Sequence, residues 1–120
     1  MKENARRERR ISMEIVVDAY TPEEQAMGWY YYLEDKLRFP FRANCILAKA
    51  ISPLRKGESV EVLSMAPEDD CLHAMFVIIR WEKRRLGVPL AQLEPITTVD
   101  GRTKEAVADW HYWVLRGYEL

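Results

Sequence analysis

The sequence predicts an α+β fold, with helices near both ends of the chain and a small SH3-like antiparallel β-barrel or sheet in the middle. Apolar residues recur at helical spacing over residues 1–38 and 102–116, whereas short apolar runs separated by turn residues fill residues 41–95. The chain has 120 residues, of which 48% are hydrophobic and 31% charged. This size and balance are typical of one globular domain, so we expect a single domain over residues 1–120.

The first helix is predicted from about residue 4 to residue 18. Ile11, Ile15, Val16 and Ala19 fall at helical spacing there, with charged residues between them. The first ten residues are rich in Lys and Arg. A solvated helix start is the favoured interpretation of this basic end, and contact with a membrane or nucleic acid is the alternative.

The second helix is predicted to begin after Thr21 and to end near Leu37. Thr21 can cap it, Pro22 suits the first helical position, and Glu24 can close a capping box. Pro40 disfavours helix in the residue before it. The aromatic run at residues 29–32 indicates burial between the β core and another helix, whereas an exposed part of it would mark a protein-binding patch.

Four strands are predicted in the middle of the chain, over residues 41–51, 59–65, 71–81 and 86–93. Residues 52–57 form a turn-rich connector, and Gly87 and Pro89 indicate that the last strand is kinked or at an edge. A final helix is predicted from Thr103, with Gly117 placed to end it. Its two tryptophans are expected to pack onto the barrel or onto the first helices.

Composition excludes several classes of function. Cys45 and Cys71 are too few for a disulfide framework, so we expect free, buried thiols in a reducing cytoplasm. The N-terminus has no signal-peptide pattern, and no stretch approaches about 18 consecutive apolar residues. The net charge of −1 supplies no general field for nucleic acid. We therefore expect neither a membrane nor a nucleic-acid partner.

Two acidic clusters stand out, and the first is Glu34 and Asp35 in the last turn of the second helix. The helix dipole opposes acids there by about 0.3–1 kcal/mol each. A hard cation such as Ca²⁺ would relieve that repulsion and could also use the free carbonyl groups of the helix end. On spacing alone the favoured alternative is a solvated face on which Lys36 and Arg38 neutralise the pair.

The second cluster is the run Glu68, Asp69 and Asp70, which follows Pro67 and precedes a predicted strand. Three consecutive acids point in different directions, so at most two of them can share one ion. On pattern alone an exposed turn is the favoured alternative. No EF-hand loop is present, so any calcium site must be assembled from separate segments.

Other chemistry finds little support in the residues. Cys45, Cys71, His73 and His111 could supply zinc ligands, but they lack the paired spacing of a zinc site. The sequence has no phosphate-binding Gly-rich loop and no recognisable pairing of a nucleophile with a base. We therefore do not expect an enzyme.

Several stretches together resemble a known family. They are Trp29 to Asp35, Phe39-Pro40-Phe41, Ser52-Pro53-Leu54, Gly57-Glu58, Met65-Ala66, Val88 to Leu93 and Asp109 to Trp113. These motifs resemble the CcbP-like family of small cyanobacterial-type calcium-binding proteins. The resemblance implies an α+β domain with an SH3-like core that binds Ca²⁺ without an EF-hand.

We therefore predict a cytoplasmic, non-catalytic calcium-binding protein that buffers or senses Ca²⁺. The predicted metal ligands are Glu34, Asp35, Glu68, Asp69 and Asp70. The alternative is a metal-free, SH3-like interaction module. Such a module would dock a protein partner through its Trp/Tyr face and its basic N-terminus.

Overall fold

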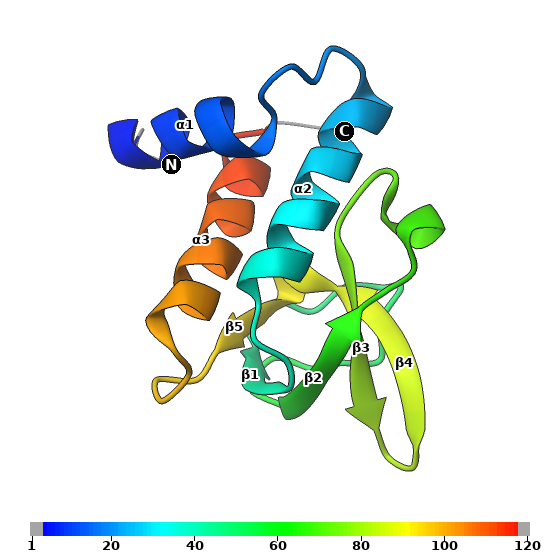
Figure 1. Cartoon of the computed structure of the whole chain (residues 1–120). Coiled ribbons are helices and arrows are strands. Elements are labelled where there is room, and N and C mark those ends of the chain that lie inside the picture. The colour runs from blue at the N-terminus through cyan, green and yellow to red at the C-terminus, as the bar shows by residue number, and fades with distance from the viewer. Residues whose placement is uncertain (1–3, 118–120) are drawn as a thin grey trace.

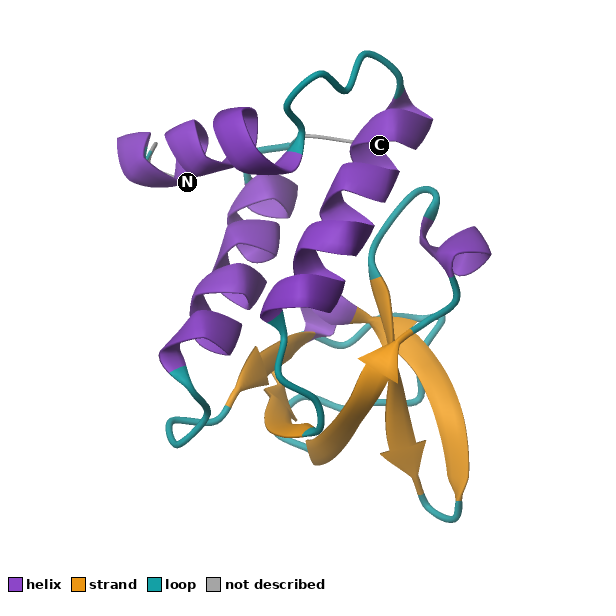
Figure 2. Ribbon diagram, in the orientation of Figure 1, coloured by secondary structure: helices purple, strands orange, loops and turns teal. Residues whose placement is uncertain are grey.

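The computed structural model describes residues 4–117, which form three α-helices and a five-stranded antiparallel sheet, with α2 and α3 packed against the sheet (Figure 1). The α-helices are α1 (Ala5–Arg10), α2 (Pro22–Lys36) and α3 (Gly101–Leu115). The strands are β1 (Phe41–Cys45), β2 (Ser59–Met65), β3 (Phe76–Trp81), β4 (Arg84–Pro89) and β5 (Leu93–Pro95). Three short turns of helix complete the fold: a π-helical η1 (Ile11–Ile15) and two 3₁₀ turns, η2 (Glu68–Cys71) and η3 (Leu90–Gln92). Helices and strands are segregated, which confirms the α+β class (Figure 2).

The second predicted helix begins and ends where the sequence indicates. The Thr21 hydroxyl accepts a hydrogen bond from the backbone N–H of Glu24 at 3.1 Å, as an N-cap does. The first helix is shorter than predicted, because the α-helix ends at Arg10 and a π-helical turn follows to Ile15. There the chain turns back onto α2, and the Ile15 carbonyl packs closely against Gly28.

The sequence alone favoured a solvated basic N-terminal helix, but two of its arginines pair with an acid on α3. Arg7 and Arg10 reach α3, where both bind the carboxylate of Asp109. Figure 1 shows α1 lying across the C-terminal part of α3. Arg6 and Arg9 do remain exposed, and Lys2 lies outside the described residues.

Three of the predicted strands have different bounds. The first ends at Cys45 and not at residue 51, because the chain then loops away toward residue 59. The third begins at Phe76 and not at Cys71, since Cys71 closes η2 and its thiol contacts the Phe76 backbone. The predicted strand over residues 86–93 is interrupted by η3, which separates β4 from a short β5.

The strand order is β4-β3-β2-β1-β5, so β4 and β5 are the two edges of an open sheet. The closed barrel that the sequence suggested is not formed by the described strands, whereas the edge position of the Pro89 strand is confirmed. The register between β2 and β3 shifts between Val62 and Ser64. This bulge lets both Val62 and Met65 face the core despite their odd spacing.

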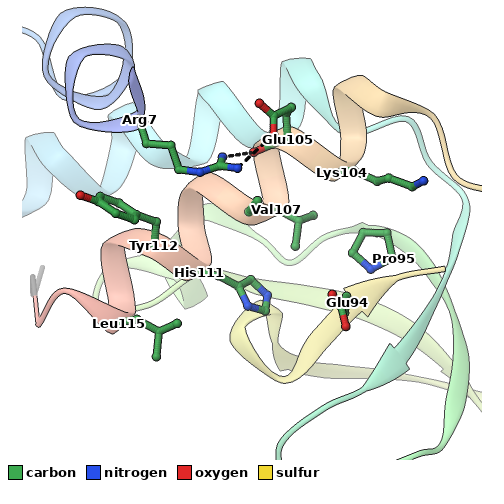
Figure 3. Close-up of a pocket in the computed structure, with 10 residues that line it drawn as sticks. Arg7, Glu94, Pro95, Lys104, Glu105, Val107, His111, Tyr112 and Leu115 are labelled. Carbon is green, nitrogen blue, oxygen red and sulfur yellow. Dashed lines mark hydrogen bonds and ion pairs between the residues drawn. The ribbon is translucent and has the colours of Figure 1, made fainter. Parts of the chain in front are cut away.

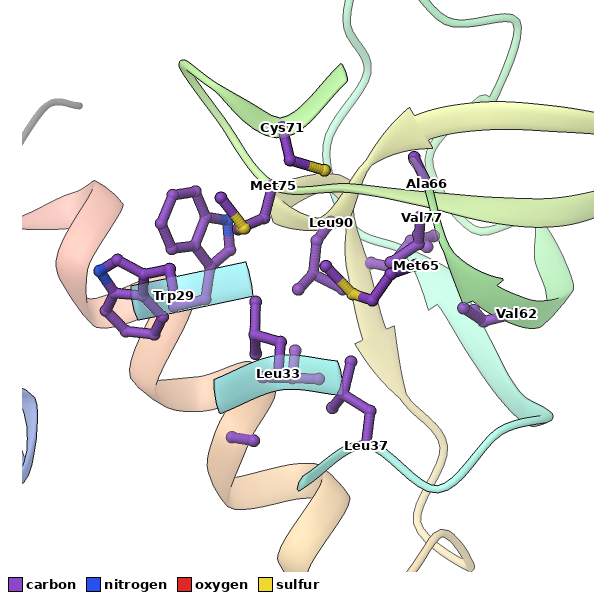
Figure 4. Close-up of a cluster of buried hydrophobic side chains, with 14 of the residues drawn as sticks. Trp29, Leu33, Leu37, Val62, Met65, Ala66, Cys71, Met75, Val77 and Leu90 are labelled. Carbon is purple, nitrogen blue, oxygen red and sulfur yellow. The ribbon is translucent and has the colours of Figure 1, made fainter. Parts of the chain in front are cut away.

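The core lies between α2 and the sheet. Trp29 and Leu33 of α2, with Leu37 just after it, face a group of buried side chains from the β core (Figure 4). This group includes Met65, Met75, Val77 and Leu90. On its other side Trp29 meets the two tryptophans of α3, Trp110 and Trp113, with ring centroids 5.0 and 5.6 Å apart. α3 therefore packs on the N-terminal helices, one of the two positions expected for it.

Within the part of the chain that the structure describes, every helix is too short or too polar to span a lipid bilayer.

Candidate metal centre

The acidic turn η2 is held against α2 by two adjacent tyrosines. The buried Tyr30 hydroxyl donates a hydrogen bond to the carbonyl oxygen of Ala66 at 2.8 Å, which fixes the backbone just before the turn. The exposed Tyr31 hydroxyl donates to Oε1 of Glu68, also at 2.8 Å. Cys71 anchors the end of the turn, because its buried thiol bonds with the backbone of Phe76. Burial raises the pKa of this thiol.

Glu34 lies on the same side of α2 as this turn. It follows Tyr31 by three residues and Tyr30 by four, which places all three side chains on neighbouring positions of the helix surface. Burial raises the pKa of Tyr30, and the charges of Glu34 and Glu68 raise it further. The hydrogen bond to Glu68 raises the pKa of Tyr31, again with a contribution from Glu34. Both carboxylates therefore lie close to the tyrosine pair.

Asp35 points toward a different element. Nη2 of Arg102, in the first turn of α3, lies 3.3 Å from the Asp35 carboxylate and 3.2 Å from the Asp35 carbonyl oxygen. The Lys36 ammonium lies 3.6 Å from the same carboxylate. The Asp35 side chain is nevertheless 68% exposed. The alternative interpretation, in which Lys36 and Arg38 neutralise the acidic pair, is thus partly correct for Asp35. Lys36 is one partner, but the second is Arg102 and not Arg38.

The five predicted ligands are not gathered into one cluster. Glu34 and Glu68 share the surroundings of Tyr31, Asp35 is paired on the α3 side, and Asp69 and Asp70 are exposed in η2. Among residues 4–117, no group of three or more His, Cys, Asp or Glu is close enough to hold a metal ion. The donor set is nonetheless the right kind for Ca²⁺, since it consists of exposed carboxylates beside the carbonyl groups of a helix end. These residues fit calcium in chemistry, and side chains must move to surround an ion.

The zinc alternative is not supported. Cys45 and Cys71 are free and buried, as expected, and each thiol is hydrogen-bonded to backbone. His111 Nε2 lies 2.7 Å from the carbonyl oxygen of Leu93. His73 is exposed in the loop before β3. Within residues 4–117 these four side chains belong to no group that could hold a metal.

A groove of about 450 Å³ runs along α3 beside β5 (Figure 3). His111, Val107 and Leu115 of α3 line it, together with Glu94 and Pro95 of β5. The acid at its rim, Glu105, is bound by Arg7 (Figure 3). This groove therefore offers a mixed polar and apolar surface, and not a group of free oxygen ligands.

Sequence reasoning missed the residues that contact the predicted ligands. Tyr30 and Tyr31 were interpreted as buried aromatic residues or as a protein-binding patch, although their spacing from Glu34 was visible. Arg102 carries no local signal, because it lies 67 residues from Asp35 in the chain.

Comparison with known proteins points to one family. A model of the CcbP family, described as calcium binding, matches residues 9–114. The crystal structure of Anabaena CcbP is 43% identical, covers 100% of this chain and 98% of its own, and superposes with a TM-score of 0.88. A structure of a calcium binding protein in the calcium-binding form is also 43% identical, covers 98% of this chain and 96% of its own, and has a TM-score of 0.86. No curated protein matches the chain.

Proposed function

Because this chain belongs to the CcbP family of calcium-binding proteins, we propose that it binds Ca²⁺ itself. The observation that carries the proposal is the 43% identity, over nearly the full length of both chains, to a structure in its calcium-binding form. The metal-free interaction module is not favoured. Within the aromatic run Trp29 and Tyr30 are buried in the core, and Tyr31, which is 54% exposed, donates its hydroxyl to Glu68.

The proposed ligands remain the five acids, with Glu34 and Glu68 at the centre. Their support is position, because Glu68 accepts a hydrogen bond from Tyr31 and Glu34 lies three residues after Tyr31 on the surface of the same helix. Asp69 and Asp70 lie next to Glu68 in η2 and can contribute after a small movement of the turn. Asp35 offers a carboxylate and a carbonyl oxygen at the end of α2. Bound Ca²⁺ would supply positive charge that offsets the repulsion among these acids.

The proposed role is binding without catalysis, as a calcium buffer or sensor. Sensor sites and weaker sites span dissociation constants of about 10⁻⁷ to 10⁻³ M, and a site that is not preassembled belongs toward the weaker end. Free buried thiols at Cys45 and Cys71 are consistent with a reducing compartment such as the cytoplasm.

Calorimetric titration of the full chain with Ca²⁺, and separately with Mg²⁺, tests the proposal. We expect heat of binding with Ca²⁺ at or below about 1 mM, the weak end of the range for protein sites. Amide NMR spectra should shift mainly at residues 31–35 and 66–71. Absence of both heat and shifts at millimolar Ca²⁺ would contradict the proposed function.

Substitutions locate the site. Glu68→Gln removes one charge at nearly constant shape and should weaken calcium binding by about tenfold or more. Asp35→Asn decides whether the end of α2 takes part, because unchanged affinity would place the ion elsewhere. Glu61→Gln is the matched control, since Glu61 is an acid on β2 whose partner is Arg80. Its affinity should equal that of the unmutated protein.

Calcium should also stabilise the fold if it binds only the folded chain. At a free calcium concentration 100-fold above the dissociation constant, the gain in the free energy of unfolding is about 2.7 kcal/mol. Thermal unfolding with added Ca²⁺, and again after excess chelator, measures this gain and its reversal.

A further inference from the structure

Two of the proposed ligands already accept hydrogen bonds from side chains of the protein, and the two donors differ in charge. Glu68 accepts from the neutral hydroxyl of Tyr31 at 2.8 Å. Asp35 accepts from the cationic guanidinium of Arg102 at 3.3 Å. Neither tyrosine nor arginine is itself a ligand for Ca²⁺, so their effect on the ion must be indirect.

The Tyr31 hydroxyl restricts the Glu68 side chain without reducing its charge. It occupies one lone pair of Oε1 and leaves the other oxygen for an ion. The turn itself does not depend on this bond, because Tyr30 separately holds the carbonyl of Ala66. Neutral donors that orient a ligating carboxylate in this way raise metal affinity.

Arg102 acts on Asp35 in another way. A single guanidinium nitrogen, Nη2, contacts both the carboxylate and the carbonyl oxygen of Asp35. These are two of the oxygens that the end of α2 could offer to a cation. The positive charge of Arg102 thus occupies the position that the ion would need, and it repels a divalent ion nearby.

We propose that Tyr31 and Arg102 set the calcium affinity in opposite directions. Tyr31 is a positioning residue that holds Glu68 ready for the ion, whereas Arg102 is a built-in competitor that must leave Asp35 before the ion can use it. This inference rests on the proposed function, since it assumes that calcium binds at these acids.

The test is the calcium dissociation constant of four variants, measured by calorimetry at about 0.15 M salt, where remote charges are screened. Tyr31→Phe removes only the hydroxyl and should weaken binding about tenfold, the low end of the effect of such orienting groups. Arg102→Gln should tighten binding about two- to fivefold, the fold-change expected for an exposed ion pair. The matched controls are Tyr20→Phe, at an exposed loop tyrosine, and Arg80→Gln, at the exposed Arg80–Glu61 pair. Both should leave the affinity unchanged.

Two further measurements separate positioning from general damage. The amide NMR spectrum of calcium-free Tyr31→Phe should change only near residues 31 and 66–71, with the same thermal midpoint as the unmutated chain. Arg102→Lys keeps the charge and should keep the original affinity, whereas loss of the charge in Arg102→Gln should not.

The outcomes are distinct. Weaker binding by Tyr31→Phe together with tighter binding by Arg102→Gln supports the inference. If the unmutated protein binds Ca²⁺ but both variants bind equally well, or both bind more weakly, the inference is wrong and the proposed function stands. If the unmutated protein does not bind Ca²⁺ at all, the proposed function fails and the inference fails with it.

Discussion

Arg10 and Asp109 form a bidentate ion pair that joins the N-terminal helix to α3. Nε of Arg10 lies 2.8 Å from Oδ2 of Asp109, and Nη2 lies 2.8 Å from Oδ1. Arg7 adds a bond of 2.7 Å, and the Tyr32 hydroxyl on α2 donates another at 2.8 Å. Burial together with this hydrogen bond raises the pKa of Tyr32. One buried carboxylate thus connects all three α-helices.

Replacing Asp109 by Ala should destabilise the fold strongly. Its side chain is fully buried, and those of Arg7 and Arg10 are only 20% and 18% exposed. The change leaves these two largely buried cations with the partly exposed Glu105 as their remaining carboxylate partner. Removing one partner of a buried pair costs about 3 kcal/mol or more. Urea unfolding of Asp109→Ala measures this cost. Glu61→Ala, which breaks the exposed pair with Arg80, should cost less than about 1 kcal/mol. Equal losses in the two variants would refute a special role for Asp109.

Gly28 is a position on α2 that leaves no room for a side chain. A Cβ atom built there would overlap the carbonyl oxygen of Ile15, which belongs to backbone and cannot rotate away. Gly28→Ala should therefore lower the free energy of unfolding by about 1–3 kcal/mol, despite the better helix propensity of Ala. Gly101→Ala, in the first turn of α3, meets no atom within 4 Å and should be neutral or stabilising. Thermal unfolding of both variants measures the two effects. A Gly28→Ala variant that is more stable than the unmutated protein would show that η1 does not pack against α2 as described.

Leu33 carries much of the contact between α2 and the sheet. It is fully buried and faces the β core beside Trp29 and Leu37 (Figure 4). Leu33→Ala should cost about 2–5 kcal/mol, because it removes buried methyl groups and leaves a cavity. The same substitution at Leu115, which is 61% exposed at the end of α3, should cost well under 1 kcal/mol, the usual size for surface changes (about 0.5 kcal/mol). Denaturant unfolding of the two variants compares their free energies of unfolding. Similar losses of stability would show that Leu33 is not part of the core.

The sequence predicts the parts of the fold that local chemistry determines. Thr21 and Pro22 set the start of α2, and Pro89 keeps its strand at an edge of the sheet. The open edges of the sheet and the bulge after Val62 depend on how distant segments pair, so they leave no local pattern in the sequence. The predicted length of the first helix was also wrong, because the chain leaves helical geometry after Ile15 and packs against Gly28, a contact with no local signal.

The candidate site was predictable as a set of residue types and not as an arrangement. Glu34 and Asp35 oppose the helix dipole, and Glu68 to Asp70 form an acidic run, so both clusters could be found from the chain alone. The side chains that donate hydrogen bonds to two of these acids are distant in the sequence. Tyr31 is 37 residues from Glu68, and Arg102 is 67 residues from Asp35. Only the folded chain reveals that these acids already have partners. The fully buried state of Asp109 was equally invisible, since its partner Arg10 is 99 residues away.

His111 makes stability depend on pH near neutrality. Burial lowers its pKa below the ordinary value of about 6.5, and the contact with the Leu93 carbonyl only partly opposes this. The unfolded chain then binds a proton at a higher pH than the folded chain does. Between the two pKa values the unfolded state holds more protons, so the free energy of unfolding falls as pH falls. The loss begins near pH 6.5 and ends once pH drops below the pKa of the folded state.

Urea unfolding between pH 7.5 and pH 5 measures this dependence in the calcium-free protein. One proton limits the slope to about 1.4 kcal/mol per pH unit. His111→Phe cannot titrate, so its stability should change less over this range, even though it loses the bond to Leu93 at every pH. His73→Gln, at the exposed histidine before β3, should keep the full slope of the unmutated chain. If His111→Phe retains that slope, the pH dependence arises from other groups and the buried imidazole contributes none of it.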